Sequence, residues 1–277
     1  MGALSKRAAG AALINANVGL FACPICQDSM NVYDQGRLTC SANHSFDIAK
    51  QGYVNMLTHS AASKYSKDLF ESRKEIIDSG LYDPLEERIA ELIGDAKTVL
   101  DTGCGEGSHL ARILSHRDDS IGIGIDIAKE GILAAARHYP KQIWCVGDLA
   151  KSPFARTSFD VILNILSPAN YEEFKRLLTR NGCVVKVVPQ SSYLQQLRTQ
   201  LYADSAKETY SNEQTVERFR ESFSHVTVER ITYTVPLASM LVPALLEMTP
   251  MGWHKAQHAE VNVSEITIDV DVLVGRV

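Results

Sequence analysis

The chain has 277 residues, enough for one domain of ordinary size and a small second unit. Apolar residues make up 45% of it, which supports a sizeable core, and no apolar run reaches the length of a membrane span. The formal net charge of −5 excludes an overall polybasic protein, so a nucleic-acid partner would have to meet a local basic surface. Asn15 and Asn17 interrupt the apolar run near the N-terminus, so we predict no targeting segment and expect a cytoplasmic protein.

Four potential metal ligands follow this run. Cys23 and Cys26 form a C-x2-C pair, and Cys40 with His44 forms a C-x3-H pair. Redox-active C-x-x-C motifs lack such a distal pair, and a disulfide is not expected in a cytosolic protein. Three thiolates and one imidazole complete a tetrahedral zinc site without an open position. The spacing therefore predicts a structural zinc ion, with a short hairpin over residues 33–39 between the two pairs.

The segment after the zinc ligands, residues 44–57, mixes aromatic side chains with Lys50 and a glycine bend. It would suit stacking on unpaired bases, and equally packing around a zinc knuckle too small to have its own core. Helical spacing follows over residues 67–79 and 85–93. Tyr82, in the turn between these helices, could face a bound ligand or simply pack. We expect three units: an N-terminal extension with the zinc knuckle (1–60), a helical linker that packs on the ligand site (61–95) and a larger α/β domain (96–277).

The central motif is the stretch VLDTGCGEG, residues 99–107. A short apolar strand reaches a turn with three alternate glycines, Gly103, Gly105 and Gly107, where the backbone can approach a ligand closely. Helical spacing begins directly after this turn, which completes a nucleotide-binding layout. A second strand, residues 120–125, ends in Asp126, and an acid at this place can accept hydrogen bonds from both hydroxyls of a ribose.

Two features separate this loop from a dinucleotide-binding loop. The dinucleotide fingerprint is G-x-G-x-x-G, whereas Ser108 stands here where the third glycine should fall. Asp101, at the end of the strand, would repel a pyrophosphate but suits a cationic amino-acid group. The combination resembles motif I of class I S-adenosylmethionine-dependent methyltransferases, so we expect that methyl donor as the cofactor.

The rest of the chain predicts the remainder of an open α/β sheet. Strands over residues 142–147, 159–165 and 183–188 alternate with helices over 129–138 and 171–178. Asp148 follows the third strand, where this fold positions an acid near the adenine amino group, and Asn164 lies at the carboxyl end of the fourth, where such sheets keep their reaction site. Strands over 225–235 and 266–274 predict an antiparallel end pair, the last of them half exposed, with an apolar helical stretch at 239–248 between them. The loop with Trp253, His254 and Lys255 suits either substrate contact or a helix end with a buried Trp.

Together these residues resemble the RlmA family of bacterial 23S rRNA (guanine-N1)-methyltransferases. The resemblance covers Cys23 to the C-terminus, and it is carried by the zinc ligands, the segment Phe46–Asn55, the residues Gly80, Tyr82 and Pro84, the glycine loop and the stretch Met248-Thr249-Pro250. The stretches Ser167–Tyr171 and Glu265–Ile268 are most similar to the Gram-positive subgroup, which is associated with tylosin-type macrolide resistance.

The resemblance implies a class I, Rossmann-like and seven-stranded methyltransferase domain over 96–277, an RNA-recognition role for the zinc domain, and a homodimer. It implies that Cys23, Cys26, Cys40 and His44 bind zinc. With the analysis of the loop, the expected cofactor-binding residues are Tyr82, Asp101, Gly103, Gly105, Glu106, Gly107, Asp126, Asp148 and Tyr193, the last of which falls where some relatives place a His.

The expected reaction is methyl transfer to N1 of a guanine in a hairpin of 23S rRNA. Guanine N1 carries a proton and is paired in a duplex, so the base must be unpaired or flipped out and a group must accept the proton. We expect Asn164 to orient the guanine edge as a catalytic residue, whereas no base is identified. Two alternatives are a methyltransferase for a small molecule, which would not need a zinc knuckle, and a non-catalytic zinc- and RNA-binding adaptor, which would not need an intact glycine loop.

Overall fold

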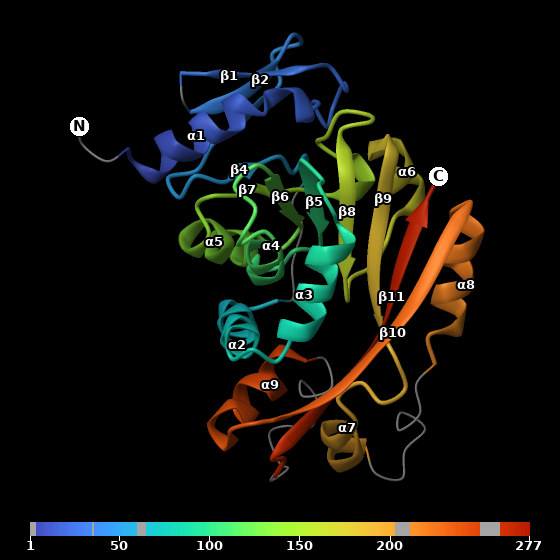
Figure 1. Ribbon diagram of the computed structural model, residues 1–277. Coiled ribbons are helices and arrows are strands. Elements are labelled where there is room, and N and C mark those ends of the chain that lie inside the picture. Colours follow the sequence, from blue (N-terminus) through green and yellow to red (C-terminus); the bar gives the residue numbers. More distant parts are fainter. Residues whose placement is uncertain (1–3, 35, 60–64, 203–210, 250–260) are drawn as a thin grey trace.

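A mixed eight-stranded sheet forms the centre of the protein, as a computed structural model describes it for residues 4–34, 36–59, 65–202, 211–249 and 261–277 (Figure 1). The strand order is β10-β11-β9-β8-β5-β6-β7-β4, and β11 runs antiparallel to both of its neighbours. The strands are β4 (Val54–Asn55), β5 (Thr98–Thr102), β6 (Ile121–Asp126), β7 (Ile143–Val146), β8 (Phe159–Ile165), β9 (Leu178–Pro189), β10 (His225–Pro236) and β11 (Glu265–Arg276).

The eighth strand, β4, corrects the expectation of seven. Val54 and Asn55 pair in parallel with Cys145 and Val146 of β7, and the N–H of Met56 donates to the carbonyl of Val146 at 2.8 Å. A strand of two residues has no periodicity that a sequence pattern can detect. It forms because it satisfies the free backbone groups at the β7 edge.

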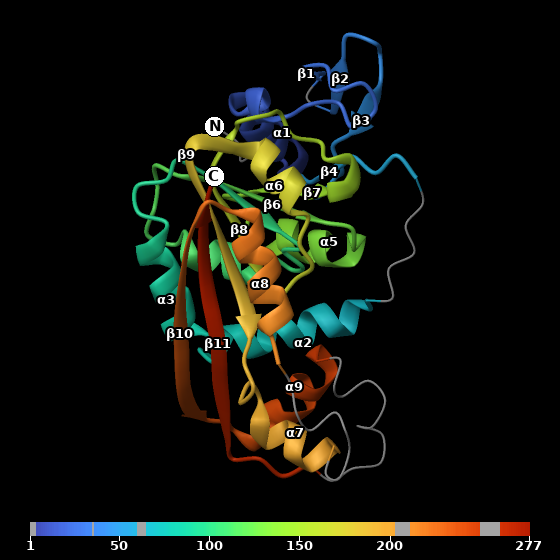
Figure 2. The same cartoon turned by 90° about the vertical axis from the view of Figure 1, so that its right-hand side faces the viewer.

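Helices cover both faces of the sheet. On one face, α3 (Asp83–Leu92), α4 (Ser108–Ile113) and α5 (Lys129–His138) share a hydrophobic core with the sheet. On the other face the core is shared with α1 (Lys6–Ala16), α6 (Tyr171–Leu177) and α8 (Glu213–Ser222), of which α6 and α8 stand in front of the sheet in Figure 2. The protein is therefore a three-layer α/β structure, as expected.

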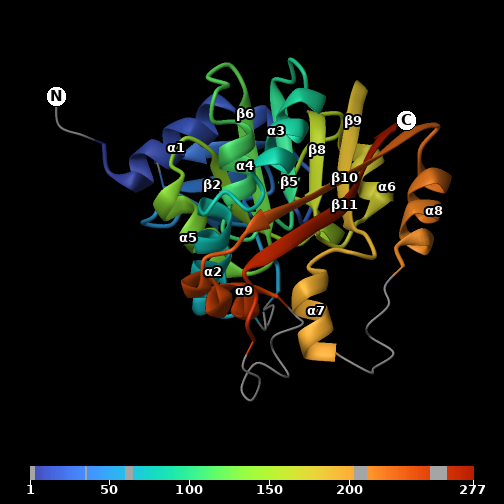
Figure 3. The same cartoon turned by 60° about the horizontal axis from the view of Figure 1, so that its bottom comes forward.

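Three further helices lie at the carboxyl end of the parallel strands. They are α2 (Lys67–Asp78), α7 (Gln195–Tyr202) and α9 (Val242–Met248), and Figure 3 shows them together at this end. Short 3-10 helices complete the described chain at Val18–Leu20, Leu149–Lys151 and Ser239–Leu241. In the described part of the chain, no helix is both long and apolar enough to cross a bilayer.

The N-terminal unit is a three-stranded ribbon of β1 (Met30–Tyr33), β2 (Arg37–Cys40) and β3 (Ser45–Asp47), at the top of Figure 1. It packs directly on the large domain, where the ring of Phe21 meets that of Phe154 at 5.6 Å between centroids. Buried side chains of α1 join the same core as strands β5, β6 and β8. Aromatic and apolar side chains therefore hold the N-terminal unit against the large domain.

The last strand, β11, is almost wholly buried, so the expectation of a half-exposed strand was wrong. Its polar residues alternate as predicted, but they have partners inside the protein. The carboxylate of Asp269 accepts hydrogen bonds from the Arg230 guanidinium at 2.8 Å, from Thr232 Oγ1 at 2.8 Å and from the Ser192 N–H at 3.0 Å. Alternation alone does not distinguish a solvated face from such an internal network.

The residues 250–260, with Trp253, His254 and Lys255, lie outside the described residues.

Candidate functional site

The four predicted metal ligands come together at one end of the ribbon. Their ligand atoms all lie within 4.8 Å of one another, with 3.5 Å from Cys23 Sγ to His44 Nδ1 and 3.6 Å between the sulfurs of Cys26 and Cys40. Zn–S bonds of about 2.3 Å in a tetrahedron place ligand atoms about 3.8 Å apart, so the cluster fits zinc. With four protein ligands it has no open position, in agreement with the structural role predicted from the spacing.

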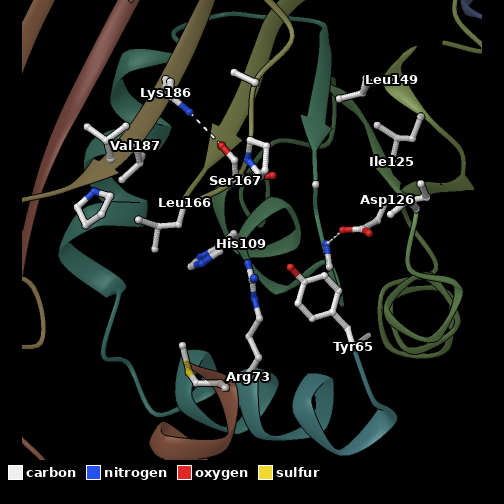
Figure 4. A pocket seen from close by; sticks show the side chains of 18 of the residues that line it. Tyr65, Arg73, His109, Ile125, Asp126, Leu149, Leu166, Ser167, Lys186 and Val187 are labelled. Atoms are coloured by element: carbon white, nitrogen blue, oxygen red, sulfur yellow. Dashed lines mark hydrogen bonds between the residues drawn. The ribbon is translucent and has the colours of Figure 1, made fainter. Parts of the chain in front are cut away.

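The glycine loop borders a cavity of about 900 Å³ at the carboxyl end of the parallel strands (Figure 4). Gly103 has a φ of 71° and packs so closely that a Cβ there would lie 2.0 Å from Ser167 Oγ. Gly107 has a φ of 81°, and a Cβ there would lie 2.3 Å from the Trp144 ring. Only glycine meets both demands. These close contacts are with Ser167 and Trp144, so the close approach to a ligand stays a prediction.

Asp126 ends β6 at the wall of this cavity. Its Oδ2 accepts a hydrogen bond from the N–H of Gly105 at 2.8 Å, and its Oδ1 accepts one from the N–H of Ala128 at 2.7 Å. Burial raises the pKa of this carboxyl above its ordinary value, although the two backbone donors oppose the shift. Each oxygen keeps a second lone pair, so the carboxylate can still accept hydrogen bonds from two neighbouring hydroxyls.

Arg73 is a site residue that the sequence analysis missed. It reaches from α2 to Glu106, with 3.0 Å from its Nε to Glu106 Oε2. Among the described residues, neither this Nε nor either carboxylate oxygen of Glu106 has a hydrogen-bond partner of good geometry, although all are buried. A signal existed in the sequence, because Arg73 lies three residues from Phe70 and three from Ile76, on the apolar stripe of its helix.

Asp101 lies behind the glycine loop, and burial raises the pKa of its carboxyl to about 7 while Arg73 opposes the shift. Asp101 is 2% exposed and Glu106 is 1% exposed, so both acids are buried near Arg73. Two acids and one arginine therefore meet with incomplete hydrogen bonding at the base of the cavity. Such an arrangement can accept a ligand that carries both an ammonium and a carboxylate group.

Two predicted tyrosines line the cavity and contact each other. The hydroxyls of Tyr82, just before α3, and Tyr193, just before α7, lie 2.7 Å apart. Tyr82 also meets the ring of His109 edge to face at 5.2 Å, and His109 Nδ1 lies 2.6 Å from Glu86 Oε1. Asp148 lines the cavity after β7, where its Oδ1 accepts from the N–H of Ala150 at 2.8 Å.

Asn164 is 0% exposed and lies behind the cavity wall. Its Nδ2 donates to Thr102 Oγ1 and to the carbonyl of Pro168, both at 3.0 Å, and its Oδ1 accepts from Lys186 Nζ at 2.5 Å. The structure therefore gives Asn164 a supporting position in place of the direct guanine contact expected of it.

The cavity brings together six of the ten residues expected at the cofactor or the reaction: Tyr82, Gly103, Gly105, Asp126, Asp148 and Tyr193. Asp101, Glu106, Gly107 and Asn164 lie directly behind its wall. It also includes residues that were not expected, among them Tyr171 on α6, Lys186 on β9 and Arg218 on α8.

The sheet order, the glycine loop after β5 and the acid at the end of β6 define a class I S-adenosylmethionine-dependent methyltransferase fold, here joined to a zinc ribbon. The family model described as "RlmA, N-terminal" matches residues 21–67, and one described as "Methyltransferase domain" matches residues 99–186.

Three curated relatives are similar to this protein over most of its sequence. The Bacillus subtilis protein named "Putative 23S rRNA (guanine-N(1)-)-methyltransferase YxjB" is 42% identical, covering 92% of this chain and 96% of its own. The 23S rRNA (guanine(748)-N(1))-methyltransferase of Streptomyces fradiae is 31% identical, covering 92% and 95%. A Micromonospora griseorubida relative of similar name is 29% identical, covering 84% and 86%. The chain belongs to the RlmA family.

Proposed function

We propose that this protein transfers a methyl group from S-adenosylmethionine to N1 of a guanine in a hairpin of 23S rRNA. One observation carries the proposal: a closed zinc ribbon and a methyltransferase cavity occur in one chain that is similar, over 92% of its length, to proteins named for this reaction. A small-molecule methyltransferase would have no use for the ribbon. A non-catalytic adaptor would have no use for the glycine loop with its positive φ angles and for Asp126.

The cavity residues fit the methyl donor. Asp126 would hold the two ribose hydroxyls, Asp148 the adenine amino group, and the glycine loop the backbone of the methionine part. Arg73 would hold the methionine carboxylate, while Asp101 and Glu106 would hold its ammonium group. These contacts would supply partners for Arg73 Nε and for the two carboxylate oxygens of Glu106, which lack them among the described residues. When bound, the donor supplies an electrophilic methyl group on a sulfonium.

We propose that the target guanine enters between α6 and α8. Tyr171 and Arg218 line this side of the cavity, and Tyr171 is held by the rings of Phe219 at 5.6 Å and Phe223 at 5.9 Å. A fixed aromatic ring can stack on a flipped-out base, and an exposed arginine can bind the phosphate beside it.

A second cavity, of about 550 Å³, supports a role of the ribbon in RNA binding. It lies between the ribbon and the large domain, with Gln27 and Ser29 on one side and Lys151 and Arg156 on the other. Neither of these two basic side chains has an acidic partner among the described residues. An RNA strand that follows this seam would meet positive charge despite the net charge of −5.

We also propose a division of the chain into three units. Residues 1–60 would recognise RNA and residues 96–277 would carry the reaction, while the linker, 61–95, would close the cofactor site through Arg73 and Tyr82. As the family resemblance implies, we also propose a homodimer that acts in the cytoplasm, where ribosomal RNA is present, and a methylation that lowers sensitivity to tylosin-type macrolides.

In the experiment, the purified protein and labelled S-adenosylmethionine are incubated separately with 23S rRNA, with free nucleosides and with small-molecule extracts. We expect label only in the RNA, and N1-methylguanine after nuclease digestion and mass spectrometry. Label only in small molecules would favour the first alternative, and tight RNA binding without any transfer would favour the adaptor.

A further inference from the structure

Among the residues that the structure describes, Lys186 is a buried lysine without an acidic partner. It lies in β9 between Asn164 of β8 and Leu273 of β11, and it is 3% exposed. Its Nζ donates to Asn164 Oδ1 at 2.5 Å and to the carbonyl of Ser167 at 3.0 Å, and both acceptors are neutral. Within the described residues no carboxylate forms an ion pair with it. Lysines are rarely buried in this way, so its place calls for a functional reason.

The amine lies at the wall of the cavity, close to the glycine loop. Ser167, whose carbonyl accepts from Lys186, packs its hydroxyl on Gly103 of the glycine loop. The preceding Leu166 has a φ of 51°, a strained conformation that the surrounding structure holds at the end of β8. Figure 4 shows Lys186 pointing to Ser167 across the cavity wall. Ser167 therefore links Lys186 to the loop that would hold the methyl donor, through one contact on each side.

The two hydrogen bonds of the Lys186 amine leave its lone pair without a partner when the amine is uncharged. An uncharged lysine amine has two hydrogens and one lone pair. The two hydrogens are taken up by Asn164 and Ser167, so the lone pair is free to face the cavity that Lys186 lines. Asn164 itself is fixed by Thr102 and Pro168, which makes it a positioning residue for this amine.

Burial lowers the pKa of Lys186 to about 8. Among the described residues, the charged and titratable groups on this side of the sheet include Tyr171 on α6 and Arg218 on α8, which line the same cavity, and Asp271 on β11, whose Oδ2 accepts from Gln190 and Asn212. None of them forms a contact with the amine. Burial therefore shifts Lys186 toward its uncharged form, and a pKa of about 8 lies at the upper end of the range in which a lysine serves as a general base.

We propose that Lys186 is the general base that takes the proton from guanine N1, an inference that rests on the proposed function. In this step the bond from N1 to the methyl carbon forms, and the sulfur–methyl bond breaks with its electron pair left on sulfur. The N1 proton passes to Lys186 Nζ, which becomes an ammonium still held by Asn164 and Ser167. The proton then leaves to solvent before the next turnover.

The test compares K186M, K186A and K186R with the wild type on the rRNA substrate. We expect kcat near pH 7.5 to fall about 100-fold or more in each variant, while the Kd for S-adenosylmethionine stays within about threefold. The arginine variant keeps the charge but cannot accept a proton, so it should be as slow as K186M. Lys175→Met on α6, outside both cavities, is the matched control and should keep its kcat.

Chemical rescue and pH separate a base from a merely structural lysine. We expect methylamine or ethylamine to restore part of the kcat of K186A in proportion to the free amine, and the wild-type kcat to rise with pH through about 8, a rise that K186M lacks. Full activity in K186R or K186M, or no rescue of K186A, overturns the inference. Absence of N1-methylguanine with the wild type overturns the proposed function instead, and the inference with it.

Discussion

Arg73 and Glu106 form an ion pair at the base of the cofactor cavity, with 3.0 Å between Nε and Oε2. One residue comes from the helix before the sheet and the other from the glycine loop, so the pair joins the linker to the methyltransferase domain. The carboxylate of Glu106 is fully buried and the arginine side chain 22% exposed. Within the described parts of the chain, Arg73 Nε and both carboxylate oxygens of Glu106 have no hydrogen-bond partner, and a zwitterionic ligand would provide one.

Replacing Arg73 with Met should remove the partner of a buried carboxylate. We expect the free energy of unfolding to fall by about 3–5 kcal/mol, as for other buried pairs that lose one member. Affinity for S-adenosylmethionine should fall with it. In the double variant R73M/E106Q, stability should recover in part while affinity should not. Urea unfolding and calorimetric titration measure both, with Lys67→Met on the exposed side of α2 as the control. Unchanged affinity in R73M would contradict the carboxylate-binding role.

Local spacing explains what the sequence revealed of this site. Cys23, Cys26, Gly103 and Asp126 lie at fixed intervals from a turn or a strand end, so their chemistry can be inferred without knowing the tertiary structure. The strand positions of the sheet followed from apolar runs in the same way.

The residues that were missed are placed by contacts between distant segments. Arg73 comes to the glycine loop because α2 folds over the carboxyl end of the sheet, and β4 forms because the edge of β7 is free. Lys186 interrupts an apolar strand, but only the structure shows that the interruption faces Asn164, Ser167 and a cavity. A polar residue inside an otherwise buried strand was the available signal.

The zinc ion should support the ribbon and not the cofactor site. Replacing Cys26 with Ser, or adding a strong chelator, should release zinc and loosen the ribbon within about the first 60 residues, because the metal holds its two ligand pairs together. Metal analysis and hydrogen exchange measure this, and calorimetry should find S-adenosylmethionine still bound. Loss of both ligands at once would show that the division near residue 60 is wrong.

Asp126 should support the cofactor site and not the zinc ribbon. Asp126→Ala removes the acceptor of two ribose hydroxyls, and two hydrogen bonds to a charged group correspond to about a 100-fold loss of affinity for S-adenosylmethionine, with zinc content unchanged. The control is Asp160→Ala at the opposite end of β8, because Asp160 Oδ2 accepts from the N–H groups of Lys97 and Thr98 and lies far from the glycine loop in its strand. That variant should lose stability and keep its affinity. The reverse pattern would exclude Asp126 as the ribose acid.

Asp101 should make the ligand-free protein less stable as the pH rises. Burial raises the pKa of its folded-state carboxyl to about 7 from an ordinary value of 3.8, so between these values the native state binds more protons than the unfolded state. The free energy of unfolding should therefore fall by at most about 1.4 kcal/mol per pH unit across this window and level off above pH 7. Asp101→Asn, which has no titration, should flatten the fall in urea unfolding measured from pH 4 to pH 8. Affinity for S-adenosylmethionine should rise with pH through about 7 in the wild type, because the ammonium group needs the ionised carboxylate, and should stay low and constant in the variant. If both proteins gave the same two pH profiles, Asp101 would not be the partner of the ammonium group.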